Sequence, residues 1–124
     1  MTLLISIILF FLLAPSAPVN ISINSTLSSM WFHWLPPVYP NGKIVKYQYM
    51  FHRTSQLNND TLFELSDTAR EIEFDGLEFY TQYSFKIRAI NTLDGEWSQT
   101  FKRYTDPNRK YFLKYHLATF IISF

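Results

Sequence analysis

Three asparagines carry the clearest chemical signal in the sequence. Each stands two positions before a Ser or Thr, with no proline between: Asn20, Asn24 and Asn59. This pattern is the acceptor for N-linked glycans, a modification of secreted proteins. Asn20 and Asn24 fall on the outward side of an alternating segment and Asn59 falls in a turn, so a glycan would leave a core undisturbed. The pattern predicts a glycoprotein, with chance occurrence as the alternative.

Residues that could perform catalysis are present but are not grouped as catalysis requires. The three histidines are far apart and show no metal-ligand spacing: His33, His52 and His116. The chain has 3 glycines and no glycine-rich phosphate loop or nucleophile elbow. Six carboxylates lie between Glu64 and Glu78, where two could act as acid and base, but those from Glu71 to Asp75 alternate with apolar residues, as on a solvated strand face. We expect no enzyme, no metal and no cofactor.

Composition narrows the class of protein further. The 124 residues suffice for one domain, and 48% hydrophobic with 17% charged residues excludes a disordered chain. The absence of cysteine excludes a disulfide-stapled miniprotein, a Cys-type zinc site and a thiol nucleophile. A net charge of +1 gives no electrostatic reason to expect a nucleic-acid partner.

An alternation of apolar and polar residues predicts that the middle of the chain forms strands. Five segments alternate with a period of two, which is typical of strands with one buried face: 19–24, 30–34, 45–51, 71–75 and 83–89. Weaker strands are expected near 61–65 and 98–104, and turns rich in Pro, Asn and Gly separate the segments. Seven short strands predict two antiparallel sheets packed face to face. The expected core includes Trp34, Tyr47, Tyr83, Phe85 and Ile87.

The start of the chain is apolar in a way that differs from the middle. Leu3 to Leu13 is an unbroken run of eleven apolar or small residues, which suits a secretory signal, whereas a membrane span needs about 20. Cleavage fits best after Ser16, so residues 1–16 are interpreted as a signal peptide. The run has no preceding Lys or Arg, and Pro15 lies in the cleavage site. An upstream extension of a domain cut from a longer chain is the alternative.

The end of the chain is also apolar. Asp106-Pro-Asn108 is a linker signal, which gives a domain at 17–105 and a tail at 106–124. The uninterrupted apolar part, 117–124, is too short to cross a bilayer. It could be the truncated start of a membrane segment, an additional packed segment, or translated non-coding sequence.

Motifs in nearly every expected strand resemble one family of domains. They are an entry segment at 15–20, Trp34 followed by Pro36-Pro37, the segment 41–49, Ile72–Leu77, and Tyr83–Asn91 with its Arg-Ala-x-Asn ending. The chain is similar to fibronectin type III domains. The resemblance implies an all-β, seven-stranded antiparallel immunoglobulin-like sandwich. It also implies that Tyr83 forms a tyrosine corner, with its ring packed below Leu77 in the core and its hydroxyl bonded to nearby backbone.

Exposed aromatic residues suggest where a partner could bind. Trp31 and His33 lie on the outward side of their segment, and Tyr39 lies in the proline-rich turn that follows. Such residues are usual anchors for protein partners, although single exposed aromatics are also ordinary on sandwiches. Trp97-Ser98 matches half of the Trp-Ser repeat of cytokine-receptor domains, and no Arg-Gly-Asp occurs.

The resemblance implies a non-catalytic extracellular module that binds protein or acts as a spacer in a cell-adhesion or receptor protein. Contact with a membrane would come only through sequence missing from this chain or through the apolar tail. Three alternatives remain: a ligand-binding domain of a cytokine-type receptor, an accessory domain of a secreted carbohydrate-active enzyme, and an intracellular muscle-type repeat.

Overall fold

The computed structural model describes residues 13–108 and residue 110. Most of the signal-like segment (1–12) and the apolar tail (111–124) lie outside the described residues. Seven strands form two antiparallel sheets, as predicted: β1 (Val19–Ser25), β2 (Met30–Leu35), β3 (Lys46–Arg53), β4 (Phe63–Ser66), β5 (Glu71–Phe74), β6 (Gln82–Ile90) and β7 (Phe101–Tyr104).

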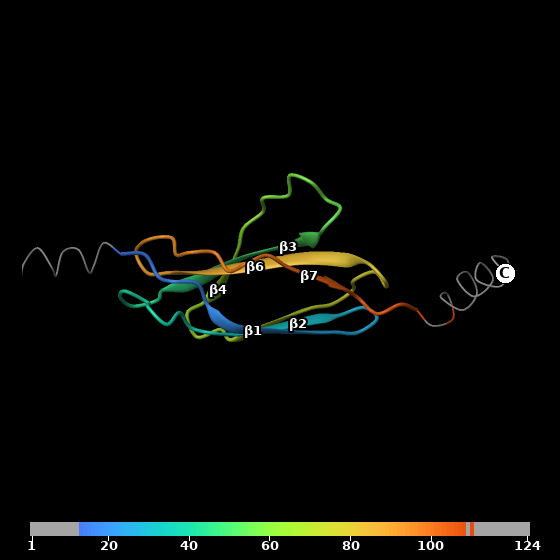
Figure 1. Ribbon diagram of the computed structural model, residues 1–124, viewed down its shortest axis with the longest axis horizontal. Helices are drawn as coiled ribbons and strands as arrows, with labels where there is room; N and C mark the ends of the chain where they lie inside the picture. Colours follow the sequence, from blue (N-terminus) through green and yellow to red (C-terminus); the bar gives the residue numbers. More distant parts are fainter. Residues whose placement is uncertain (1–12, 109, 111–124) are drawn as a thin grey trace, which may run out of the picture.

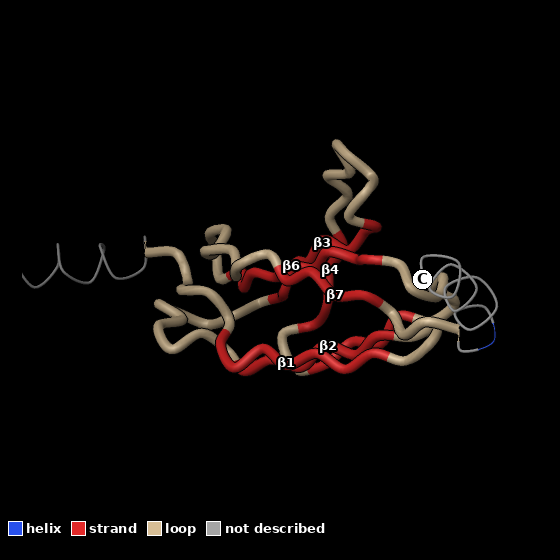
Figure 2. The backbone as a smooth tube through the Cα atoms, turned by 45° about the vertical axis from the view of Figure 1, so that its right-hand side comes forward, coloured by secondary structure: helices blue, strands red, loops and turns tan. Residues whose placement is uncertain are grey.

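The two sheets lie face to face. One has the order β1-β2-β5 and the other the order β4-β3-β6-β7. Figures 1 and 2 show these layers, with the loop between β3 and β4 projecting away from the sandwich. The described chain enters at one end of the long axis and leaves at the other (Figure 1). The two ends of the described part of the chain therefore lie away from both broad outer faces.

Inward side chains of β2 and β6 form the centre of the core. Phe32 of β2 is 1% exposed and stacks on Phe85 of β6 with ring centroids 4.0 Å apart. On either side lie the other fully buried large residues of these strands and β3: Met30, Trp34, Tyr47 and Ile87. Phe51 and Phe74 stack at 3.7 Å and continue the aromatic interior. Since the chain has no disulfide, burial of these rings has to hold the sheets together.

The edge strands differ in their bounds from the predicted ones. β4 covers Phe63–Ser66, later than 61–65, because the Thr61 N–H donates to the Asn59 side chain at 3.3 Å. β7 covers only Phe101–Tyr104. Ser98 bonds β6 through its backbone and its side chain, but its hydroxyl also donates to the Gln99 carbonyl, and the ladder resumes only at Phe101. The alternation of apolar and polar residues does not reveal these side-chain hydrogen bonds, which shift the ends of the strands.

Tyr83 holds the loop that precedes its own strand. It is 6% exposed, and its hydroxyl accepts a hydrogen bond from the Glu78 N–H at 3.1 Å. Leu77, partly buried, packs against the same core. Thr105, which sequence reasoning missed, fixes the other side of this loop: its hydroxyl donates to the Glu78 carbonyl at 2.6 Å and accepts from the Thr81 N–H at 3.0 Å.

Residues 13–16, which precede β1, are packed onto the sandwich. Pro15 is fully buried, and its carbonyl accepts a hydrogen bond from the Glu96 N–H at 2.9 Å. Buried Asn91 donates from its amide to the carbonyls of Leu13, Pro40 and Asn41 at 3.0 to 3.1 Å. The chain entry is thereby tied to two loops at one end of the molecule.

Candidate interaction surfaces

The outer face of the β1-β2-β5 sheet carries two of the predicted partner-binding residues. Strand pairing arranges its side chains in two rows, Asn24–Trp31–Glu73 and Ser22–His33–Glu71. The His33 ring lies 3.3 Å from the Glu71 carboxylate. Trp31 and His33 are both partly buried. The face therefore combines one large aromatic with carboxylates and with sequon residues.

Carboxylates crowd one end of this face. A hydrogen bond that protonated Glu73 donates to the neighbouring Asp75 carboxylate raises the pKa of Glu73 above its usual value, with smaller contributions from burial and from the Asp75 charge. A bond with the Trp31 side chain acts in the opposite direction. Asp75 also accepts a bond from the Ser29 hydroxyl at 3.1 Å. These groups are solvated acids, and they are not arranged around a pocket.

Tyr39 lies on a separate surface. It is 68% exposed in the loop between β2 and β3, beside Val38, which is 63% exposed. The Tyr39 N–H donates to the Ser16 hydroxyl at 3.0 Å, which places the loop at the end where the chain enters. Trp31 lies near the opposite end of β2, roughly 13 Å along the strand from Leu35. The three expected anchors thus form two surfaces instead of one patch.

The outer face of the other sheet contains a stack that sequence reasoning missed. Lys86 and Arg88 of β6 lie over the Trp97 ring, with their charged groups 4.5 and 4.4 Å from its centroid. Arg88 also donates to the Gln48 side chain at 2.8 and 3.0 Å. The sequence shows that Lys86 and Arg88 lie on the same side of β6, which indicates two neighbouring cations on the outer face. It does not show the position of Trp97, which depends on how the loop before β7 folds back.

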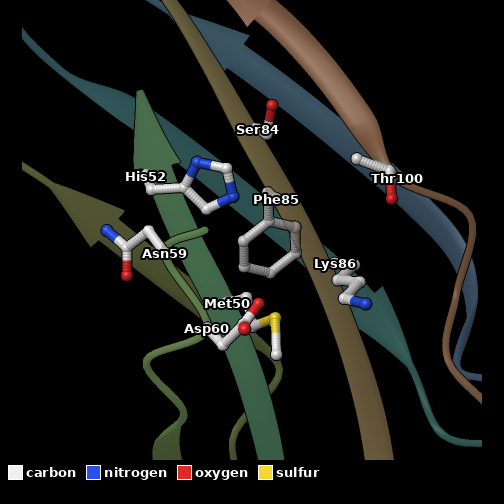
Figure 3. A pocket seen from close by; sticks show the side chains of 8 residues that line it. All are labelled: Met50, His52, Asn59, Asp60, Ser84, Phe85, Lys86 and Thr100. Atoms are coloured by element: carbon white, nitrogen blue, oxygen red, sulfur yellow. The ribbon is translucent and has the colours of Figure 1, made fainter. Parts of the chain in front are cut away.

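A small pocket lies between the β3–β4 loop and the outer face of β3 and β6. Its volume is about 170 Å³, and Figure 3 shows its lining: Met50, His52, Asn59, Asp60, Ser84, Phe85, Lys86 and Thr100. Pockets for drug-sized ligands usually hold about 300 Å³ or more. Within residues 13–108 and residue 110, no cluster of His, Asp or Glu could hold a metal ion. The pocket has polar groups but no nucleophile paired with a base.

The three sequon asparagines sit in different settings. Asn20 is exposed, with a positive φ of 52°, inside the irregularity between the Val19 and Ser22 pairs of β1. Asn24 is exposed in the regular part of β1. Asn59 is partly buried in the projecting loop and lines the small pocket. No helix in the described part of the chain is long and apolar enough to span a membrane.

Comparison with known families settles the kind of domain. A family model described as "Fibronectin type III domain" matches residues 15–104. The chain belongs to the fibronectin type III family. Among curated proteins it is similar to the phosphatidylinositol phosphatase PTPRQ of Rattus norvegicus, with 33% identity over 75 residues, and to neogenin of Homo sapiens, with 30% identity over 104 residues. These matches cover 60% and 76% of this chain but only 3% and 7% of the relatives.

Solved structures show the same fold. A computer-based redesign of a β-sandwich protein superposes with a TM-score of 0.62 at 26% identity, covering 78% of this chain and 94% of the other. The fibronectin type III domain of human contactin 1 gives 0.63 at 19% identity, covering 77% and 82%. The FN5 domain of Drosophila Lar gives 0.60 at 23% identity, covering 77% and 100%.

Proposed function

We propose that this fibronectin type III domain is a non-catalytic extracellular module of a cell-surface receptor or adhesion protein, where it binds protein or separates neighbouring modules. The observation that carries the proposal is the placement of the two ends of the described domain. The described chain enters and leaves at opposite ends of the long axis (Figure 1), so further modules can attach in line without covering either broad face. The matches to short stretches of much longer proteins support the same arrangement.

The side chains of the domain support binding in preference to catalysis. The cations over Trp97 are held by ring contacts, and Arg88 is also bonded to Gln48. The carboxylates near Glu73 are solvated, and the His33–Glu71 pair lies on the open outer face of a sheet. Such groups can complement a partner surface through shape and charge.

Exposure to the secretory pathway is tested by glycosylation. Expression of the chain in secretory cells should give a product whose electrophoretic mobility increases after digestion with peptide N-glycosidase, because Asn20, Asn24 and Asn59 match the acceptor pattern. A variant with all three changed to Gln is the matched control and should show no shift. An unmodified wild-type product would contradict the extracellular proposal.

The Tyr39 loop is the proposed contact for a protein partner. Tyr39 is more exposed than the other two expected anchors, Val38 beside it is also exposed, and the bond to Ser16 keeps their loop in place, so little conformational entropy is lost on binding. Binding of the labelled domain to cultured cells should fall roughly ten-fold in Tyr39→Ala, the scale of a moderate hot spot. Leu57→Ala, at an 83% exposed residue elsewhere, is the control. Equal binding by wild type and Tyr39→Ala would refute this contact.

A further inference from the structure

Asn24 is the one sequon asparagine with an aromatic residue paired to it across a strand. The register of β1 and β2 sets Asn24 directly opposite Trp31, with both side chains on the outer face of the sheet. Opposed residues in an antiparallel pair have their Cβ atoms about 4.5–5.5 Å apart. A group attached to the Asn24 amide therefore starts within reach of the indole ring.

A carboxylate lies opposite Trp31 on the other side of the row. Glu73 of β5 is its opposite partner, and an interaction with the Trp31 side chain acts to lower the pKa of Glu73. An indole nitrogen only donates, so the N–H edge is the part of Trp31 that can interact with this carboxylate. Trp31 therefore lies between a carboxylate on β5 and the sequon residue Asn24 on β1.

The other two sequons lack this arrangement. Asn20 lies inside the β1 irregularity, between the pairs that Val19 and Ser22 make with β2. Asn59 lies in the projecting loop, where its side chain already accepts the Thr61 N–H. A glycan at either residue would extend from the domain without a strand-paired ring beside it.

We propose that an N-linked glycan on Asn24 folds back over Trp31, with the C–H face of its first sugar packed on the indole. This inference rests on the proposed extracellular function, because only a secreted chain acquires the glycan. An aromatic ring has apolar faces of negative electrostatic potential, which suit the weakly positive C–H groups of a sugar ring. The occupant of the Trp31 surface is then the chain's own glycan, and the Tyr39 loop remains for protein partners.

A double-mutant cycle tests the contact. The full chain is made in secretory cells with Asn20→Gln and Asn59→Gln, so that Asn24 is the single acceptor. Asn24→Gln and Trp31→Leu are added singly and together, and Tm is measured for all four proteins. Loss of the glycan should lower Tm by about 3 °C when Trp31 is present and by a third of that or less in the Trp31→Leu variant. His33→Ala, at the next outward residue of β2, is the control that should retain the full glycan effect.

A spectroscopic measurement covers the case in which Trp31→Leu fails to fold. In a Trp97→Phe background Trp31 supplies the quenchable fluorescence, because Trp34 is only 2% exposed. Acrylamide quenching should increase when Asn24→Gln removes the glycan, because the sugar no longer covers the indole. Trimming the glycan to its first sugar with an endoglycosidase should preserve the protection.

The outcomes separate this contact from the proposed function. Suppose that mass spectrometry finds a glycan on Asn24. If the loss of this glycan changes Tm equally with and without the Trp31→Leu substitution, or leaves the quenching unaffected, the contact alone is overturned. A chain that carries glycans only on other sequons also overturns the contact alone. A wild-type chain with no glycan at any sequon overturns both the contact and the extracellular proposal.

Discussion

The loop between β5 and β6 depends on two single hydroxyl groups. Tyr83 accepts the Glu78 N–H, and Thr105 bonds the Glu78 carbonyl and the Thr81 N–H. Both side chains are almost fully buried, so their hydroxyls have little access to water as an alternative partner. The sequence could predict the role of Tyr83, because this residue belongs to an alternating apolar segment and to a motif that resembles the family. It could not predict Thr105, whose partners are 24 and 27 residues away in the chain.

Replacing Tyr83 with Phe should remove one hydrogen bond and leave the ring in the core. The free energy of unfolding, measured by chemical denaturation, should fall by about 1 kcal/mol because the Glu78 N–H loses its acceptor. Tyr49→Phe is the matched control, since that ring packs against Phe63 and Phe74. If Tyr83→Phe and Tyr49→Phe are both as stable as wild type, the Tyr83 hydroxyl does not stabilise the fold.

At the scale of elements, the alternation of apolar and polar residues gave the best predictions for strands whose two faces differ most in burial. β2 and β6 place fully buried residues on one side, so their positions agree with the pattern. β4 and β7 are edge strands with apolar residues in solvent, such as Phe63 at 43% and Tyr104 at 52% exposure, so alternation carries little information there. Parity placed Trp31 on an outer face, but its pairing with Asn24 depends on the register of β1, which is shifted between Val19 and Ser22.

The entry segment 13–16 should contribute to stability as an element of the domain. A chain that begins at Ala17 loses the burial of Pro15 and the hydrogen bonds that residues 13–16 make with Tyr39, Asn41, Asn91 and Glu96. We expect it to be at least about 2 kcal/mol less stable than a chain that begins at Leu13, from denaturant unfolding. If the two chains are equally stable, the segment packs on the domain without contributing to its stability.

The same contacts bear on processing. Cleavage after Ser16 remains a prediction of the sequence, and it would produce the chain that begins at Ala17. N-terminal sequencing of the secreted protein therefore decides whether residues 13–16 stay with the domain. A start at Ala17 would confirm the predicted cleavage site, whereas a start at or before Leu13 would refute it and leave the packed segment on the domain.

At the scale of the whole molecule, the two sheets of the described sandwich meet through aromatic rings. Phe32 contacts Phe51, Phe74 and Phe85, and so links β2 to both sheets. Phe32→Ala should lower the free energy of unfolding by about 3–5 kcal/mol, because it removes a buried ring and leaves a cavity. Leu57→Ala, at an 83% exposed residue, should change it by less than about 0.5 kcal/mol. A small effect of Phe32→Ala in thermal or denaturant unfolding would mean that the two sheets do not share one core around Phe32.

The extracellular assignment is tested most directly by labelling cells that make the protein with a membrane-impermeant amine reagent. Lys43 and Lys102 are exposed and provide accessible amines. The account predicts that intact cells, or their medium, yield the labelled protein. Labelling that appears only after the cells are permeabilised would place the domain inside the cell and contradict the account.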